Sequence, residues 1–357
     1  MHIVCIFRFV LRRIIVKRKI IPHSIFENFT IYFRCKEEKQ FVRKLRWSIW
    51  GLDLIAEEFA SALEQMQLPY SIICEHDEQT AAFLRKHENM HAYKNLKDML
   101  AADCADIIYI SSYGHRHFSC IMQCLEKGMH VLCEKSMFTN FEEAQEAFAY
   151  AEKQKLFLGE ANTIFYMPLY KEISNIMQNG KIGKLKMIRA DFGSLKEEKE
   201  EAAIYRKDCG GGALLDIGIY ALSAALQLMG TDIETVSTVG FDHPYGVDER
   251  WTILLKNTQQ ILACLDISIR SKLDKRLIIA GERAYIEVYD YHRGDHAAIV
   301  YPDGNRESIK CGSREQAVLY EIEKVQEYVR AGCQDPNRFI TIEAMNTMKQ
   351  IYRKEGK

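Results

Sequence analysis

The 357-residue chain lacks several patterns that would assign it to a specialised class. Its eleven cysteines form no C-x-x-C pair, and the closest two are Cys120 and Cys124. An odd number of irregularly spaced cysteines argues against a disulfide framework or a zinc site and favours reduced thiols in a cytoplasm. Internal repeats, low-complexity tracts and long linkers are also absent. With 48% hydrophobic and 27% charged residues, the chain is predicted to be soluble and globular, and long enough for two domains.

Positive charge is concentrated at the N-terminus. Residues 1–46 contain twelve Lys or Arg and three acids, whereas the other 311 residues contain 36 bases and 46 acids. The main body therefore carries a net charge of −10 and lacks the basic surface that nucleic-acid binding requires. We expect no nucleic-acid partner.

Residues 1–43 form a basic extension unlike the rest of the chain. Within it, Met1–Ile21 lacks the uninterrupted run of about 20 apolar residues that spans a membrane. It also lacks the small-residue cleavage site of a secretory signal. One interpretation is a basic amphipathic helix lying on an anionic membrane. We favour a start-site error, with translation beginning at Val42, because the compact fold is expected from about Lys44 and no Met lies between Met1 and Met66. A membrane partner is not expected.

From residue 44 to 165, strand-like and helix-like segments alternate. This rhythm predicts a parallel sheet with right-handed crossovers. The predicted strands are 45–51, 70–74, 106–112, a short strand ending at Glu134-Lys135, and 157–161. The predicted helices are 54–67, 78–86, 95–102, 117–127 and 141–153.

From residue 166 to 357 the strand-like runs follow one another closely, which indicates an antiparallel or mixed sheet. The predicted strands are 186–192, 234–240, 249–255, 260–268, 275–280, 284–288 and 297–301. The predicted helices are 218–229, 314–330 and 342–354.

A candidate nucleotide site opens the first of these predicted regions. Gly51-Leu52-Asp53-Leu54-Ile55-Ala56 lies between a strand and a helix, where free backbone N–H groups and the helix dipole bind phosphate. Asp53 replaces the second glycine of the dinucleotide fingerprint, and its carboxylate repels a pyrophosphate unless it turns outward or pairs with a cation. Glu75, 24 positions after Gly51, could accept the ribose hydroxyls and reject a 2′-phosphate, which predicts NAD rather than NADP. Alternatively, Glu75 is a solvated loop acid.

Two further stretches suggest chemistry. Glu134 and Lys135 end a predicted strand, and ligands bind beyond the carboxyl ends of parallel strands. A solvated Glu-Lys pair is the alternative. Later, the run Gly210–Gly212 precedes Asp216 and Tyr220, which at i, i+4 share one face of a helix. The alternative there is a glycine turn that caps a helix, with Asp216 placed for dipole reasons and Tyr220 in the core.

These pieces stand together in a chain that resembles the Gfo/Idh/MocA oxidoreductases. It looks most like the branch of dimeric dihydrodiol dehydrogenase, glucose–fructose oxidoreductase and aldose dehydrogenase. The resemblance implies an α/β fold: an N-terminal Rossmann domain with a doubly wound parallel sheet (44–165), then an α+β domain with a large open, mostly antiparallel sheet (166–357). That open sheet commonly forms an oligomer interface, so a homodimer or higher homo-oligomer is expected. The matching pieces are 45–56, 109–117, 130–136, 159–161, 210–220, 281–288 and 320–322.

The resemblance also implies a nicotinamide cofactor and a carbohydrate or polyol substrate. Lys135, Asp216 and Tyr220 match the family's catalytic and substrate-binding positions, and His117 matches the histidine of the loop after the fourth strand. Oxidising an alcohol needs a base, which is either Tyr220 with its pKa lowered by Lys135, or Lys135 itself. Asp216 would bind a neighbouring hydroxyl. The predicted cofactor-binding residues are Gly51, Asp53, Leu54, Ile55, Glu75, Ser112, His117, Glu134 and Lys135. No metal is expected, because His115, His117 and His130 lack partners at ligand spacing.

The chain departs from the family pattern near the cofactor. Besides Asp53, Ser136 replaces the proline after Glu-Lys, Tyr113 replaces another proline, and Phe165 stands where relatives often have Arg. A cis bond before Ser costs about 2.5–4 kcal/mol, so the loop is expected to relax and displace Lys135. The predicted function is hydride transfer between NAD and a secondary alcohol of a sugar, polyol or dihydrodiol-like substrate. The alternative is a degenerate, non-catalytic paralogue that binds a sugar or nucleotide.

Overall fold

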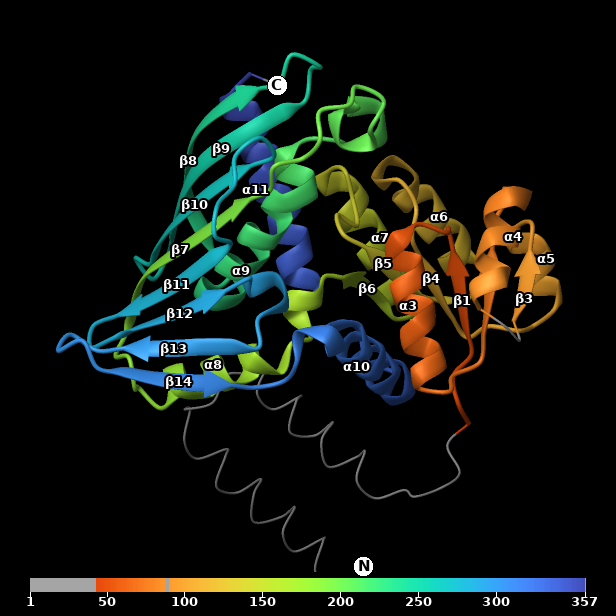
Figure 1. Cartoon of the computed structure of the whole chain (residues 1–357), viewed down its shortest axis with the longest axis horizontal. Helices are drawn as coiled ribbons and strands as arrows, with labels where there is room; N and C mark the ends of the chain where they lie inside the picture. Colours follow the sequence, from red (N-terminus) through yellow and green to blue (C-terminus); the bar gives the residue numbers. More distant parts are fainter. Residues whose placement is uncertain (1–42, 88–89, 357) are drawn as a thin grey trace, which may run out of the picture. The chain divides into compact units, whose positions relative to one another are not determined.

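The computed structural model describes residues 43–87 and 90–356. Figure 1 shows two sheets in this part of the chain, with helices packed on both. Except for Arg43, the predicted basic extension lies outside the described residues. Both interpretations of the extension therefore stay predictions.

The first sheet has six parallel strands in the order β3-β2-β1-β4-β5-β6. This is the Rossmann order, in which a ligand crevice opens where β1 and β4 diverge. The predicted parallel sheet is confirmed, and the three-residue strand β3 was not predicted. The strands are β1 (Trp47–Trp50), β2 (Tyr70–Ile73), β3 (His91–Tyr93), β4 (Ile107–Ile110), β5 (His130–Glu134) and β6 (Leu158–Ala161).

Five helices connect these strands. Asn95 and Asn140 cap two of them, because each side-chain oxygen accepts a hydrogen bond from a free N–H of the first turn at 2.9 Å. The fourth helix begins at Gly114, three residues before its predicted start, so His117 lies in its first turns rather than in a loop. The helices are α3 (Leu54–Gln65), α4 (Asp77–Lys86), α5 (Leu96–Ala101), α6 (Gly114–Glu126) and α7 (Phe141–Gln154).

The second sheet has eight strands in the order β14-β13-β12-β11-β7-β10-β9-β8. Its neighbouring strands are antiparallel except β7 and β10, so the predicted mixed, mostly antiparallel sheet is confirmed. Strand β14 was not predicted. The strands are β7 (Leu185–Gly193), β8 (Ile233–Asp242), β9 (Asp248–Asn257), β10 (Leu262–Ser268), β11 (Arg276–Gly281), β12 (Tyr285–Tyr289), β13 (His296–Val300) and β14 (Arg306–Lys310).

Helices cover one face of this large sheet (Figure 1). They are α8 (Pro168–Gln178), α9 (Ile219–Met229) and α11 (Arg338–Lys354), whereas α10 (Ala317–Ala331) packs against α3. The short helices that follow β6 are η1 (Thr163–Phe165), η2 (Ala203–Tyr205), η3 (Lys207–Cys209), η4 (Leu214–Gly218), η5 (Tyr291–Arg293) and η6 (Arg314–Gln316). The helical stretch Lys207–Met229 is long and apolar enough to cross a membrane, yet 72% of its most apolar window is buried. That burial is typical of a core helix.

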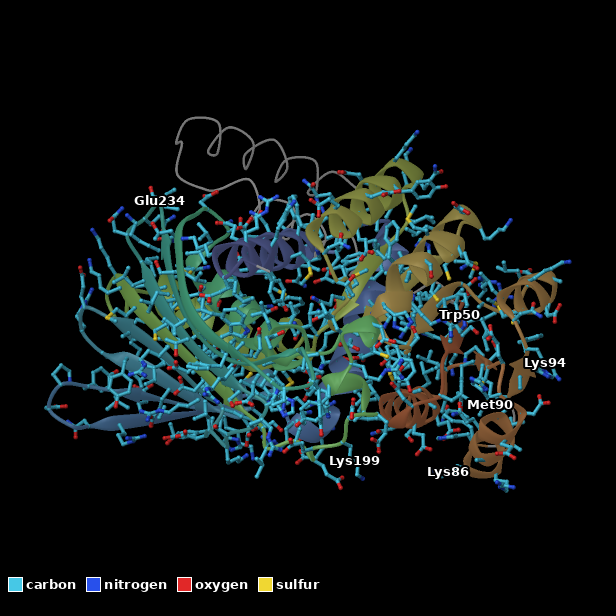
Figure 2. All side chains as sticks on the ribbon, turned by 90° about the horizontal axis from the view of Figure 1, so that it is seen from above. Trp50, Lys86, Met90, Lys94, Lys199 and Glu234 are labelled. Atoms are coloured by element: carbon cyan, nitrogen blue, oxygen red, sulfur yellow. The ribbon has the colours of Figure 1, made fainter. Side chains whose placement is uncertain are left out.

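The C-terminal helices also pack against the first sheet's half. Val318, Ile322 and Val325 of α10 belong to the same apolar core as Trp47 and Phe59. The two halves therefore share an apolar core. Figure 2 labels Trp50, Lys86, Met90 and Lys94 in the Rossmann half and Glu234 on the large sheet.

An ion pair also joins the two halves. The carboxylate of Glu58 on α3 receives two hydrogen bonds from Arg293 of η5, at 2.6 and 2.9 Å. A paired, planar contact of this kind fixes orientation as well as distance. It sets α3 against the segment that follows β12.

Candidate active site

Lys135 directly follows strand β5, and its side chain contacts Asp216 in the second half of the protein. The Lys135 ammonium lies 2.9 Å from the carbonyl oxygen of Asp216 and 3.2 Å from its Oδ1. The next side chain follows the same path, since the Ser136 hydroxyl donates to the carbonyl of Leu215 at 2.6 Å. The Lys135–Ser136 peptide bond is cis, and the expected effect of serine in place of proline on this loop stays a prediction.

Glu160 of β6 holds the loop that follows β5. The backbone N–H of Met137 donates to its Oε1 at 3.1 Å, and the hydroxyl of Thr341 on α11 donates to its Oε2 at 3.0 Å. Burial raises the pKa of Glu160 to about 7. In the sequence, Glu160 belongs only to the family-like segment 159–161, and its contact with the loop after β5 was not predicted.

His117 lies between two loops at the carboxyl edge of the sheet. Its Nδ1 is 3.0 Å from the carbonyl of Ser136 and its Nε2 is 2.8 Å from the carbonyl of Ser112. Burial lowers the pKa of His117, so the neutral ring donates to one carbonyl at a time. His117 thus ties the loop after β4 to the loop after β5.

Asp216 lies between two lysines. Its Oδ2 is 3.1 Å from the ammonium of Lys196, while its Oδ1 faces Lys135. Burial acts to raise the pKa of Asp216, but Lys135 and then Lys196 outweigh it and lower the pKa. The carboxylate is therefore ionised at neutral pH. Lys196 was missed because it precedes an acidic stretch that resembles an ordinary solvated loop.

Tyr220 completes this cluster. Its ring lies 5.1 Å from the Lys135 ammonium and stacks on Phe192 at 5.3 Å between centroids, with His292 tilted against it at 5.4 Å. Within the described residues its hydroxyl has no hydrogen-bond partner, which leaves it available to a ligand. Burial raises the pKa of Tyr220, and the opposing effect of Lys135 does not overcome it. Lys135 lowers the pKa of Tyr220 as predicted, but the larger effect of desolvation was not considered in that prediction.

The pKa of Lys135 is raised as well. Burial acts to lower it, but Tyr220, Asp216 and Glu134 together outweigh that effect. At neutral pH the cluster therefore contains an ammonium, a carboxylate and a neutral phenol. Such a set can donate a proton to a carbonyl oxygen and bind hydroxyl groups.

Asp216 and Tyr220 were predicted on one face of a regular helix. The structure places Asp216 in the π-helical turn η4 and Tyr220 in the first turn of α9. Both side chains nevertheless face Lys135. The π-helical turn η4 changes the helix geometry, but Asp216 and Tyr220 still lie close to the same lysine.

The glycine run before this turn is required by close packing. A Cβ at Gly211 would lie 2.5 Å from the carbonyl of Ala203, and one at Gly212 would lie 2.2 Å from Oδ1 of Asp248. Gly212 also has φ +119°, which favours glycine. Oδ2 of Asp248 accepts the N–H of Leu214 at 2.7 Å. The helix-cap interpretation therefore accounts for the glycines, with Asp248 as a cap that the sequence did not reveal.

The predicted nucleotide turn lies where β1 and β4 end. Gly51 has φ +108°, and a Cβ there would lie 1.6 Å from the carbonyl of Ser111, so only glycine fits. Asp53 caps α3: its Oδ1 accepts the N–H of Ala56 at 2.9 Å and the Ser111 hydroxyl at 2.6 Å. The carboxylate thus points to the helix end. Leu54 begins α3, and Ile55 is 39% exposed in its first turn.

The other predicted cofactor residues follow the strand ends. Glu75 is exposed just after β2. Ser112 follows β4, and its buried hydroxyl has no hydrogen-bond partner in the described chain. Glu134 ends β5 and accepts the Tyr109 hydroxyl at 2.5 Å, while burial raises its pKa to about 7.

A cleft with a volume of about 160 Å³ lies between the strand ends and the η2–η4 segment. It brings together Ser112, His117, Lys135 and Asp216, with Tyr113 at its mouth, 60% exposed. Gly51, Asp53, Glu75 and Tyr220 do not line this cleft. Within the described residues no three His, Cys, Asp or Glu side chains gather as metal ligands. The predicted lack of a metal stays a prediction.

Two family models match the chain. The oxidoreductase family with an NAD-binding Rossmann fold matches residues 45–161, and the GFO/IDH/MocA C-terminal domain matches residues 170–287. Trans-1,2-dihydrobenzene-1,2-diol dehydrogenase of Xenopus tropicalis is 31% identical over 248 residues, which cover 68% of this chain and 74% of that protein. The scyllo-inositol 2-dehydrogenase (NADP(+)) IolU of Bacillus subtilis (strain 168) is 28% identical over 289 residues, covering 78% and 87%.

Solved structures show the same fold. Levoglucosan dehydrogenase, solved with NADH and levoglucosan, superimposes with a TM-score of 0.79 at 15% identity, covering 88% of this chain and 98% of that one. KijD10, a 3-ketoreductase from Actinomadura kijaniata solved with NADP and TDP-benzene, gives 0.77 at 22% identity, covering 86% and 96%.

Proposed function

Because the chain belongs to the GFO/IDH/MocA oxidoreductase family, we propose that it is an NAD(P)-dependent dehydrogenase acting on a secondary alcohol, or on the corresponding ketone, of a sugar, polyol or dihydrodiol. The observation that carries the proposal is the cluster of Lys135, Asp216 and Tyr220 at the carboxyl end of β5. It joins an ammonium, a carboxylate and a phenol where a parallel sheet binds ligands.

The strand ends fit a dinucleotide. The turn at Gly51 admits no side chain, and the helix α3 that follows presents its N-terminus, where a phosphate binds, although Asp53 already accepts the N–H of Ala56. The buried, unpartnered hydroxyl of Ser112 lies one strand away, at the end of β4. We assign Gly51, Ser112, Glu134 and Lys135 to the cofactor, together with the start of α3. When bound, the nicotinamide supplies the hydride acceptor or donor.

Tyr220 is the proposed acid and base. Its hydroxyl is uncommitted, whereas the Lys135 ammonium is held by Asp216. In reduction, Tyr220 donates its proton to the carbonyl oxygen, and the positive charge of Lys135 stabilises the developing tyrosinate. In oxidation the proton returns from the substrate hydroxyl to Tyr220. Asp216 accepts a hydrogen bond from a neighbouring hydroxyl and orients the substrate.

We propose NAD as the preferred cofactor because Glu75 follows the end of β2, where a carboxylate accepts ribose hydroxyls and repels a 2′-phosphate. The IolU relative is named as NADP-dependent, so the choice needs a direct test. Asp53 favours a second candidate, a binding protein without turnover, since its carboxylate lies at the α3 N-terminus.

One experiment separates these candidates. NADH and NADPH are titrated calorimetrically into the full chain, and oxidation of sugars and polyols is then followed by absorbance at saturating cofactor. Preferential NADH binding with turnover supports the dehydrogenase. Binding without turnover supports the second candidate, and no cofactor binding rejects the dehydrogenase. Glu75→Ala should reduce the NADH preference.

We further propose a homodimer formed through the open face of the large sheet. The side chains of Met187, Val239, Phe241, Leu254 and Leu262 lie on that face and are 46–66% exposed. Adjacent exposed apolar side chains of this kind mark interaction surfaces. A monomeric mass in light scattering would reject this proposal.

A cytoplasmic location is proposed from cysteine usage. All nine cysteines in the described part of the chain are free thiols, and five of them are buried. Reduced thiols persist in the cytosol. Fractionation of cells that express the full chain tests the location.

A further inference from the structure

An unpaired lysine lies beside the catalytic cluster. Lys275 sits in the loop between β10 and β11, where its carbonyl accepts the N–H of Tyr291 at 3.4 Å. Its ammonium lies 4.8 Å from the ring centroid of Phe192, the same ring that stacks on Tyr220. Lys275 is therefore one ring away from the proposed acid and base.

Most of the charges that act on Lys275 are positive. Burial and then Lys272 lower its pKa, Asp290 opposes them, and Lys196 and Arg314 lower it further, so the net shift of the pKa is downward. Asp290 is already bound to Arg314 at 3.0 Å. In the described chain no carboxylate forms an ion pair with Lys272 or Lys275.

The rest of the cluster does not neutralise this charge. Asp216 is shared between Lys135 and Lys196, so one carboxylate serves two ammonium groups. His292 packs against Phe192 and Tyr220, and burial lowers its pKa to about 3, so it is neutral at physiological pH. A partly buried ammonium without a counter-ion is unfavourable unless a ligand supplies the anion.

Resting on the proposed function, we infer that the substrate carries an anionic group, a carboxylate or a phosphate ester, which binds Lys275 while its reacting carbon faces Tyr220. Neutral substrate hydroxyls would be satisfied by neutral hydrogen-bonding groups and would not require an unpaired, partly buried ammonium group such as that of Lys275. The substrate class is therefore an acidic sugar or polyol.

The test compares matched ligands on the enzyme saturated with reduced cofactor. Calorimetry measures gluconate against glucitol, and glucose 6-phosphate against glucose, so the two pairs separate a carboxylate from a phosphate ester. We expect at least one anion to bind about 10-fold more tightly than its neutral partner, as for a hydrogen bond to a charged group. High salt should reduce this preference.

Three variants locate the effect. Lys275→Met should remove the preference, Lys275→Arg should retain it, and Lys310→Met, on the exposed strand β14, should leave it unchanged. The inference is overturned if neither anion is preferred, if no probe binds, or if the preference survives Lys275→Met. Turnover is measured in a separate assay with oxidised cofactor. If no compound is oxidised, the proposed dehydrogenase activity is rejected, while the binding comparison still shows whether Lys275 binds an anion.

Discussion

Lys135 and Asp216 are 81 residues apart in the chain, and the ammonium of one lies 2.9 Å from the carbonyl and 3.2 Å from Oδ1 of the other. The contact joins the end of β5 to the π-helical turn before α9. It orders a flexible lysine side chain before any substrate arrives, and such preorganisation lowers the free energy needed to reach a transition state.

Replacing Lys135 with Met should reduce kcat about 100-fold or more, because the charge that stabilises the Tyr220 anion is removed. The apolar part of the side chain is retained, so folding should persist. Steady-state kinetics and calorimetric binding of NADH measure the two effects separately. Lys181→Met, at an exposed ion pair with Glu307, is the matched control. Unchanged kcat in Lys135→Met would remove Lys135 from the mechanism.

Tyr220→Phe keeps the stacking on Phe192 and removes only the hydroxyl. We expect kcat to fall about 100-fold or more while cofactor affinity changes little, since only proton transfer is lost. Measuring kcat alongside the cofactor Kd tests this split. A normal kcat would reassign the acid and base to Lys135.

Alcohol oxidation should accelerate with pH. Burial holds the pKa of Tyr220 above 10.0, so the deprotonated form needed as a base increases about 10-fold per pH unit below that value. Ketone reduction uses the protonated form and should stay level over the same range. The check is kcat/KM in both directions from pH 6 to 10 at saturating cofactor. An oxidation plateau beginning below pH 8 would contradict the assignment.

Glu160 should make stability depend on pH. Burial raises its pKa in the folded protein to about 7 from its ordinary value of 4.5. Between these values the folded state holds a proton that the unfolded state has lost, so stability falls as pH rises from 4.5 through 7 and then levels off. The loss is about 3 kcal/mol. Denaturant unfolding at pH 5 and pH 8 should show a smaller loss of stability in Glu160→Gln than in the natural chain, because Glu134 still titrates in the variant. Parallel pH dependence in both would refute it.

Asp53→Asn should tighten NADH binding about 2- to 5-fold. Asparagine keeps the helix cap to Ala56 but removes a negative charge from the phosphate-binding end of α3, an effect of about 0.3–1 kcal/mol. Calorimetry at low and high salt measures the change, which should shrink as salt screens it. Weaker binding would mean that the carboxylate contributes favourably to the cofactor site.

Much of the Rossmann half could be predicted from local patterns. β4 is a short apolar run in which all four residues are buried, and such a run is typical of a parallel strand covered on both faces. β3 was missed because His91 and Ala92 are exposed and the strand has only three residues. Period and apolar content provide no signal for a strand of this kind.

The candidate site was only partly predictable. The positions of Lys135, Asp216 and Tyr220 followed from the family pattern, but the π-helical turn did not, because it depends on Asp248 packing against Gly212. Lys196 and Lys275 stand in charged loops, and only the tertiary fold brings them near the cluster. The lowering effect of Lys135 on the pKa of Tyr220 was predicted, but the larger opposing effect of desolvation was not, because it depends on side chains distant in sequence.

Helix α10 supplies Val318, Ile322 and Val325 to the core that contains Trp47 and Phe59 near the start of the compact fold. On the ribosome, the first sheet therefore emerges long before the helix that covers it. Its apolar surface stays exposed until translation has passed α10, and such exposed surface is prone to aggregate or to recruit chaperones. A premature stop before α10 would leave that core open, even with every Rossmann strand and the whole Lys135–Asp216–Tyr220 cluster already synthesised.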